Sequence, residues 1–533
     1  MSIIQRVQRG HYVAIAIGLT IGIISFLILF GPERAIGDGD AYRWPAGDQA
    51  QHIAGAYAYI DGAWSFPIFH TDRINAPDGV NIIFTDSAPF AGLLAKTIHS
   101  LTGWRFNYLG TWFAILWIGQ AVAGAYLVRQ MGLGHPAFQA CGAIFALAWP
   151  PFLNRHFHLA LGSHFLLIFA LGLYFRTVRG AFSIRGTVPW ALLLGVAIWT
   201  HAYLFLMCLT VFIAAYGDAL LRRHIAWRQA LVTITGVVMW CVGLALIGGY
   251  QTVGAADAGG YGAFRLDLLA YVWPHGSAIL QAPVIFDPQS AFEGFNYLGL
   301  GGIFAVLAAL PFIRKRHLVW LSGHSLLILC VFGMLAFAIT NSVAAGGHQI
   351  FQLPIPTEHF PFSTFRASGR FGWAFGYLAV FGALAFLVST LERRSLSLAI
   401  VIAVGLTLLQ AVDSTLMLKG MQQGWRAEPK PVAQDMIVPA TAVHFAPPID
   451  CLADGPVQKA EIEVLAIAAK AGKKTDSAHT ARGGTLDCNA QPKVAGPGEV
   501  VIAAATGSQA DFYRKIMACH EESGLLLCSG QRP

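Results

Sequence analysis

Residues 12–30 read YVAIAIGLTIGIISFLILF, an apolar run without a single charged side chain. A helix needs about 20 mainly apolar residues to cross a bilayer, so this run predicts a membrane span. Arg6 and Arg9 precede the run, and Gly31-Pro32-Glu33-Arg34 follows it in place of a small-residue cleavage site. We therefore expect a retained first span whose N-terminus lies in the cytoplasm.

The composition of the whole chain favours a polytopic α-helical membrane protein. Of the 533 residues, 56% are hydrophobic and only 12% are charged, whereas soluble domains carry about 25% charged residues. Further apolar runs lie near 107–128, 136–152, 160–175, 188–201, 203–221, 229–250, 298–313, 318–340, 371–391 and 396–418, which gives about eleven transmembrane helices. A shorter segment, Pro89 to Trp104, contains Lys96 and His99 and predicts an amphipathic or re-entrant helix at the membrane surface.

The distribution of basic residues tests this count of spans. If the segment at Pro89 does not span, six groups of basic residues fall on the cytoplasmic side, as the positive-inside rule requires. These groups are Arg6/Arg9, Arg129, Arg176/Arg179/Arg185, Arg222/Arg223/Arg228, Arg314/Lys315/Arg316 and Arg393/Arg394. The net charge of +7 therefore reports membrane topology and does not indicate a nucleic-acid partner.

This topology places four larger segments outside the cytoplasm. They are the loops 31–106, 251–297 and 341–370 and a tail, 419–533, which predicts a small extracytoplasmic α/β domain after the transmembrane domain 1–418. The tail holds Cys451, Cys488, Cys519 and Cys528, an even number that suits disulfides in an oxidising compartment. The nearest pairs in sequence are Cys451–Cys488 and Cys519–Cys528, although four cysteines allow three connectivities.

Polar residues that could carry chemistry concentrate in the first of these loops. Asp48 and His52 are four residues apart, so on a helix they share one face, where the carboxylate could act as a general base. The alternative is that Asp48 caps the helix and the other acidic residues of the loop are solvated. Asp86 lies just before Pro89, where it could cap the surface helix or contact a substrate.

Other candidate residues lie at the predicted outer ends of later spans. His158 and His164, which follow Arg155, could line an outward-facing cavity together with His201. Arg366 and Arg370 could bind phosphate, or they could snorkel toward anionic lipid head groups. Glu293 could bind a sugar hydroxyl or an amine, or pair with Arg265, Arg366 or Arg370.

Taken together, these segments resemble the GT-C superfamily of integral membrane glycosyltransferases. The resemblance rests on GDQAQHIAGAYAYIDGAWSFP from Gly47 to Pro67, with Thr85-Asp86-Ser87, Glu293-Gly294 and Tyr297-Leu298-Gly299. It implies a GT-C-like membrane domain of an uncharacterised bacterial branch in the inner membrane, with the tail in the periplasm. It also implies transfer of a sugar from a polyprenyl-phosphate carrier to a glycan, lipid or protein of the cell envelope, with inversion at the anomeric carbon.

The resemblance also implies a role for each candidate residue. Asp48 would be the general base, and Arg366 and Arg370 would neutralise the departing phosphate. His52, Asp86, His158, His164, His201, Glu293 and Tyr297 would contact the sugar or the acceptor. The superfamily often has paired acidic residues at the catalytic position, whereas Gln49 follows Asp48 here. This departure leaves Asp38 and Asp40 as rival bases and gives no indication of a bound divalent metal or another cofactor.

Two other functions stay open at this point. A transporter or flippase would place ionisable groups at the membrane midplane, often within internal repeats, and the sequence has neither feature. An enzyme of the O-antigen-ligase or polymerase type would use arginine and histidine in a late outer loop, and residues 341–370 do contain His348, His359, Arg366 and Arg370. The acidic first loop favours the glycosyltransferase.

Overall fold

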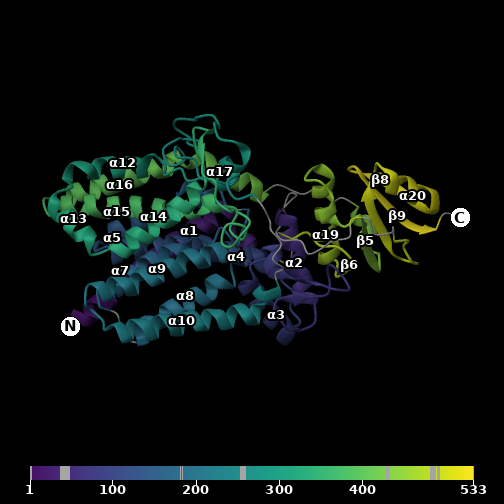
Figure 1. Ribbon diagram of the computed structural model, residues 1–533, viewed down its shortest axis with the longest axis horizontal. Helices are drawn as coiled ribbons and strands as arrows, with labels where there is room; N and C mark the ends of the chain where they lie inside the picture. The colour runs from purple at the N-terminus through teal and green to yellow at the C-terminus, as the bar shows by residue number, and fades with distance from the viewer. Residues whose placement is uncertain are drawn as a thin grey trace.

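The computed structural model describes residues 3–35, 48–155, 157–180, 182, 184–252, 260–426, 433–480, 488 and 493–531. Asp38 and Asp40, the rival bases, lie outside these described residues. The chain forms a bundle of long helices and an α/β region that carries the C-terminus, at opposite ends of the longest axis in Figure 1.

Each of the eleven predicted spans contains an apolar helix. These helices are α1 (Ile3–Phe30), α4 (Tyr108–Gln130), α5 (Pro136–Leu147), α7 (Phe165–Thr177), α8 (Ile184–Ile198), α9 (Ala202–Leu221), α10 (Trp227–Gly248), α12 (Leu300–Ala309), α14 (Ser325–Ile339), α15 (Gly372–Glu392) and α16 (Leu396–Asp413). Within the described residues, six of them, α1, α4, α9, α10, α15 and α16, are long and apolar enough to cross a membrane. The other five are shorter, so the count of eleven crossings stays a prediction.

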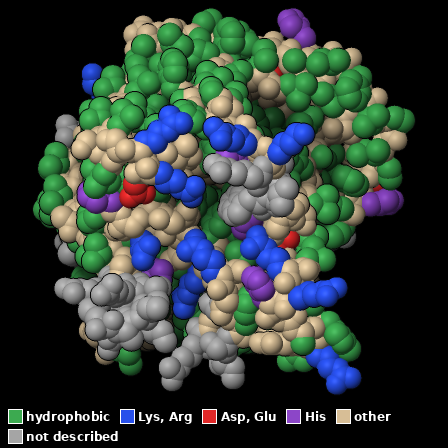
Figure 2. All heavy atoms as spheres, turned by 90° about the vertical axis from the view of Figure 1, so that its left-hand side faces the viewer, with side chains coloured by type: hydrophobic (Ala, Val, Ile, Leu, Met, Phe, Trp, Pro, Cys, Tyr) green, Lys and Arg blue, Asp and Glu red, His purple; other side chains and the backbone are tan. Residues whose placement is uncertain are grey.

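Basic side chains gather at the end of the bundle that lies farthest from the C-terminal region. Figure 2 looks at this end and shows lysine and arginine side chains spread around it. Exposed basic residues lie at or just beyond the ends of several different helices: Arg179, Arg223, Arg228, Arg314, Lys315, Arg393 and Arg394. A shared end is what the positive-inside prediction requires, although the side of the membrane is still a prediction.

Residues 48–106 of the predicted first outer loop fold into a compact layer on the other end of the bundle. It contains α2 (Asp48–Asp61), a short antiparallel pair β1 (His70–Thr71) and β2 (Val80–Asn81), and α3 (Pro89–Thr102). Helix α3 exposes Leu94, Ile98 and Leu101 while Lys96 is buried. Since an apolar face turned outward suits the headgroup boundary of a bilayer, α3 fits the predicted surface helix.

Shorter elements complete the membrane region. The helices are α6 (Pro150–Leu153), α11 (Pro288–Glu293), α13 (Lys315–Ser322) and α17 (Thr415–Arg426), and the strands are β3 (Ser342–Ala345) and β4 (His348–Gln352). Single 3₁₀ turns cover Pro32–Arg34, Ile82–Thr85, Tyr250–Thr252, Leu310–Phe312 and Ser368–Phe371 in this region and Ile449–Cys451 in the C-terminal region.

The C-terminal region is α/β, as predicted. Its sheet has the order β6-β5-β7-β9-β8, in which β6, β5 and β7 run parallel while β9 is antiparallel to both of its neighbours. The elements are α18 (Gln434–Ile437), β5 (Ala442–Ala446), α19 (Pro456–Lys470), β6 (Lys474–Thr475), β7 (Val500–Ala504), α20 (Ser508–Ile516), β8 (Met517–Glu522) and β9 (Leu525–Gln531).

Both disulfides join the cysteines that are nearest in sequence, Cys451 with Cys488 and Cys519 with Cys528. The apolar spacing from Ala510 to Cys519 is typical of a helix, but α20 ends at Ile516. Cys519 belongs to β8 and pairs directly with Cys528 of β9 across the antiparallel ladder. The cross-strand pairing and the disulfide therefore override the helical spacing of the sequence.

The C-terminal region packs firmly on the first outer loop. Apolar residues of α2 and α19 share one core, which includes Ala54, Tyr57, Leu465 and Ala469. Residues 73–76 run beside β6 through three backbone hydrogen bonds of 2.9–3.1 Å. The Arg105 side chain joins Asp61 and the carbonyl of Lys470. The tail is therefore fixed beside α2 rather than joined to the bundle by the chain alone.

Candidate functional site

A cavity of about 250 Å³ lies where α2, the segment after α6, α11 and α19 meet. Its lining combines one carboxylate, two cationic side chains and a histidine with amide and aromatic groups. The lining residues are Asp48, Gln49, Asn154, Arg155, Phe157, His158, Phe292 and Lys459. A concave site with a few convergent polar groups is where ligand binding is expected first.

Helix α2 brings Asp48 and His52 to this region. Asp48 is the first residue of the helix and is exposed to the cavity, and His52 follows one turn later and is almost fully buried. Neither ring nitrogen of His52 has a hydrogen-bond partner in the described part of the chain. Burial, followed by the neighbouring His158, lowers the pKa of His52 to about 4, so its ring is neutral near pH 7.

Asp86 lies beside His52 because a sharp turn packs against a glycine of α2. A Cβ on Gly55 would lie 2.1 Å from the Thr85 hydroxyl and 2.3 Å from the Ser87 hydroxyl, so only glycine allows this approach. Ser87 donates to the carbonyl of His52 at 2.9 Å. The prediction that Asp86 caps α3 is wrong, because Ala88 precedes that helix and no side chain caps it.

Two histidines from different elements converge on the Asp86 carboxylate. His158 Nε2 lies 3.3 Å from one carboxylate oxygen and His201 Nε2 lies 3.8 Å from the other. Burial alone would raise the pKa of Asp86, but His158, followed by His201, outweighs burial and holds that pKa below its usual range. Asp86 is therefore a carboxylate near pH 7.

The opposite ring nitrogens show which form these two histidines take. His158 Nδ1 accepts the Leu161 N–H at 3.3 Å, and His201 Nδ1 accepts the Tyr203 N–H at 3.2 Å. Since Nδ1 is an acceptor in each ring, the proton of each neutral imidazole is on Nε2 and points at Asp86.

This arrangement bears directly on metal binding. His52, Asp86 and His158 offer ligand atoms within 4.8 Å of one another, a spacing that a metal ion could use. A metal-bound histidine nitrogen must be unprotonated, whereas the proton of His158 is on the nitrogen that faces Asp86. Binding a metal there would first cost the hydrogen bond from Leu161. His158 and Asp86 therefore fit a hydrogen-bonded pair better than a pair of metal ligands, whereas His52 makes no hydrogen bond to Asp86.

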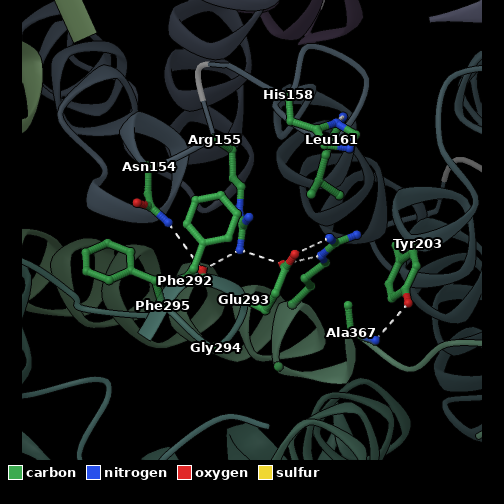
Figure 3. A network of polar contacts seen from close by, with 12 residues as sticks. Asn154, Arg155, His158, Leu161, Tyr203, Phe292, Glu293, Gly294, Phe295 and Ala367 are labelled. Atoms are coloured by element: carbon green, nitrogen blue, oxygen red, sulfur yellow. Dashed lines mark hydrogen bonds and ion pairs between the residues drawn. The ribbon is translucent and has the colours of Figure 1, made fainter. Parts of the chain in front are cut away.

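A second polar network borders the cavity and is drawn in Figure 3. Glu293 accepts two hydrogen bonds from Arg370, at 2.6 and 2.7 Å, and its Oε2 lies 2.8 Å from Arg155. Burial would raise the pKa of Glu293, but Arg155, followed by Arg370, holds it below its usual range. The network carries two positive charges and one negative charge.

Within this network, Arg155 is the cation that reaches the cavity. Its guanidinium donates to the Phe292 carbonyl at 2.5 Å and lies 4.2 Å from the centre of the Phe292 ring. Its Nη1 has no partner among the described residues, although the side chain is almost fully buried. A buried guanidinium nitrogen without a partner is costly, and Arg155 is the arginine that lines the cavity.

The remaining predicted site residues lie away from the cavity lining. His164 is fully buried and hydrogen bonds Tyr377 at 3.0 Å. Tyr297 donates to Asp413 at 2.8 Å. Arg366 packs over the Phe264 ring at 5.5 Å. The structure thus brings together Asp48, His52, Asp86, His158 and His201, with Glu293 and Arg370 beside them.

Sequence reasoning missed Lys459, which α19 of the C-terminal region contributes to the cavity. A lysine in an amphipathic helix carries no local signal, and only the packing of α19 on α2 shows where it lies. Arg155 lies beside the histidines in the sequence, but no role was predicted for it. Arg155 follows a span on the side opposite to the basic end, and an arginine at such a position could have indicated a functional residue.

Similarity to known proteins identifies the family to which this chain belongs. No curated protein matches the chain. One similar solved structure is the archaeal oligosaccharyltransferase AglB from Archaeoglobus fulgidus in complex with an inhibitory peptide and a dolichol-phosphate, with a TM-score of 0.46 and 13% identity over 88% of this chain and 64% of that chain. Another is the Archaeoglobus fulgidus oligosaccharyltransferase in complex with Zn and sulfate, with a TM-score of 0.45 and 13% identity over 87% of this chain and 62% of that chain.

The chain spans less than two thirds of the length of either oligosaccharyltransferase. Residues 19–415, well over half of the chain, match the model of the family described as "Domain of unknown function (DUF6311)", and the chain therefore belongs to this family.

Proposed function

We propose that this protein is an inverting membrane glycosyltransferase that moves a sugar from a polyprenyl-phosphate carrier to an acceptor on the extracytoplasmic side. The observation that carries the proposal is the cavity that Asp48 and Arg155 share, where α2 of the membrane region meets α19 of the C-terminal region. A carboxylate and a guanidinium in one small cavity supply the two functions that glycosyl transfer needs, a base and a phosphate ligand.

Asp48 would take the proton of the acceptor hydroxyl as its oxygen attacks the anomeric carbon. The bond between that carbon and the phosphate oxygen breaks, and the electron pair leaves with the polyprenyl phosphate. Arg155 would bind the charge that develops on this phosphate, because its Nη1 is not used by any described residue. Displacement in a single step inverts the anomeric centre.

The choice of Arg155 revises the phosphate ligands expected from the sequence. Arg370 is held in a two-pronged ion pair with Glu293, and neither it nor Arg366 lines the cavity. The Glu293–Arg370 pair supports Arg155 instead, since it fixes the carboxylate that orients the Arg155 guanidinium. Arg370 would therefore act through Glu293, as a positioning residue.

His52 would keep the base in its working form. Its ring follows Asp48 by one helical turn, is neutral near pH 7 and has both nitrogens without a described partner. Such a ring can donate to Asp48 or to the acceptor hydroxyl. The Asp86 cluster behind it fixes His158 at the edge of the cavity.

The arginine and histidine pattern that favours an O-antigen-ligase type of enzyme finds less support. His348 and His359 are exposed and do not line the cavity. Arg370 is occupied by Glu293.

The experiment that tests the proposal uses purified Asp48→Asn protein and transfer from a polyprenyl-phosphate-linked sugar. We expect a loss of at least about 100-fold in kcat, because general-base catalysis contributes that much or more. Asp78→Asn, an exposed aspartate of the same loop, is the matched control and should keep full activity. Wild-type transfer by Asp48→Asn would reject Asp48 as the base.

A further inference from the structure

Two segments at the outer end of the bundle are almost free of charge. Residues 266–286 and 342–357 contain Asp267 as their one aspartate, glutamate, lysine or arginine, although 12% of the chain is charged. We call these two segments together the apron. Asp267 itself is buried, so the apron presents no acidic or basic group of these four types to its surroundings.

The apron exposes large apolar side chains along both segments. In residues 266–286 the exposed side chains are Leu268, Leu269, Val272, Ile279, Leu280 and Val284. In residues 342–357 they are Ile350, Phe351, Leu353 and Ile355, and all five residues of β4 are exposed. A group of exposed apolar side chains of this kind indicates an interaction site, because exposing apolar surface to water is unfavourable.

Hydrogen bonds connect the two segments of the apron to each other. The Asp267 carboxylate accepts the backbone N–H groups of Gly346 and Gly347, each at 2.9 Å, and so ties the first segment to the β3–β4 turn. Leu268 N–H donates to the Ala344 carbonyl at 2.9 Å, which joins the turn at residues 268–270 to the hairpin. The exposed apolar side chains are therefore held in place.

The apron continues the surfaces of the bundle that would face lipid. Helix α14 exposes Leu329 and Phe332 and runs directly into β3. Helix α16 exposes Val412 at its end, and the Asp413 carbonyl accepts the Ala278 N–H at 2.8 Å, next to Ile279. In Figure 1 the teal and green loops near α17 occupy this end of the bundle.

We propose that the apron lies in the outer leaflet of the bilayer, at the boundary between head groups and acyl chains. An uncharged apolar surface that is continuous with the spans has its lowest free energy there, where apolar faces sink by about 5–10 Å. Helix α3, on the other side of the bundle, exposes Leu94, Ile98 and Leu101 in the same way. The two surfaces would hold the bundle at a fixed depth from both sides.

The test measures the depth of nitroxide labels in the full-length protein, reconstituted in nanodiscs of phosphatidylethanolamine and phosphatidylglycerol without any polyprenyl carrier. Labels are placed by Phe351→Cys and Val272→Cys, one on each segment of the apron. The background carries Cys330→Ser, since Cys141, Cys208 and Cys241 are buried and the other four cysteines form disulfides. Leu329→Cys on α14 is the deep reference, and Ser508→Cys on α20 is the aqueous reference.

We expect both apron labels to collide more often with oxygen than with a water-soluble nickel chelate, at a depth between the two references. Apron labels as accessible to nickel as the label at residue 508 would overturn the proposal. Labels shielded from both reagents would also overturn it, because they would show that protein covers the apron. The measurement uses no sugar donor, so its outcome is independent of the proposed glycosyl transfer.

Discussion

At the scale of single residues, Glu293 determines what the neighbouring arginines can do. It holds Arg370 through two hydrogen bonds and Arg155 through one ion pair, and all three side chains are largely buried. Two guanidiniums in one buried site would repel each other without this carboxylate. The sequence left its partner open between Arg265, Arg366 and Arg370, because spacing along the chain does not show which loops meet.

We therefore predict that Glu293→Gln is strongly destabilising. Removing one partner of a buried ion pair costs about 3–5 kcal/mol, since the remaining charges lose their compensation. The measurement is thermal unfolding of the purified protein in detergent. Asp287→Asn is the matched control, because Asp287 pairs with Arg265 at 3.2 Å and is much more exposed, so its loss should cost about 1 kcal/mol or less. Equal shifts for the two variants would contradict the role given to Glu293.

Arg155 offers a second prediction at this scale. Arg155→Lys keeps a positive charge but lacks the planar fork that can hold Glu293 and a phosphate at the same time. We expect KM for the polyprenyl-phosphate donor to rise about tenfold or more, with a smaller change in KM for the acceptor. Steady-state kinetics with each substrate varied in turn measures the two effects. Arg366→Lys is the comparison, and a larger donor effect there would return the phosphate role to Arg366.

At the scale of elements, the sequence predicted where helices form, but it did not predict which elements pack against one another. Periodicity and length placed an apolar helix in each of eleven runs and set α3 at the surface, because these features are local. Spacing also put Asp48 and His52 on one face of α2. Helix α19 packs on α2 and so brings Lys459 to the cavity. The two helices lie about 400 residues apart in the chain, and no local sequence pattern predicts that they meet.

The α2–α19 packing carries its own prediction through Glu461. This α19 residue is completely buried in the C-terminal region, and neither carboxylate oxygen has a described partner. Burial raises the pKa of Glu461 to about 8 from its ordinary value of 4.5. The folded state keeps this proton while the unfolded chain releases it, so the stabilisation is complete below pH 4.5 and is lost as the pH rises through 8.

Glu461→Gln keeps the size of the side chain and removes this titration. We expect the variant to match the wild type near pH 5 and to unfold at a temperature several degrees higher near pH 8. Thermal unfolding from pH 5 to pH 9 measures the difference. Asp511→Asn, an exposed change on α20, should show no such trend. A difference that does not depend on pH would mean that Glu461 is already ionised or paired in the folded protein.

At the scale of the whole molecule, α15 connects the two chemically distinct ends. Its 21 residues rise about 31 Å, close to the thickness of a bilayer core. Arg370 and the Glu293 network lie before its first residue, and Arg393 and Arg394 follow its last. If α15 crosses the membrane, the cavity and the basic end must face opposite compartments, whatever the number of shorter helices that also cross.

This geometry makes the topology testable with two single-cysteine variants in a Cys330→Ser background. Because the positive-inside rule puts Arg393 and Arg394 in the cytoplasm, Arg394→Cys should react with a membrane-impermeant maleimide only after the cells are permeabilised. Ser508→Cys, on the C-terminal region beside the cavity, should react in intact cells. The buried Cys208 should stay unlabelled in both variants. Labelling of both introduced cysteines from the same side would exclude α15 as a span. Reversed labelling would place the cavity in the cytoplasm, where an extracytoplasmic acceptor could not reach Asp48.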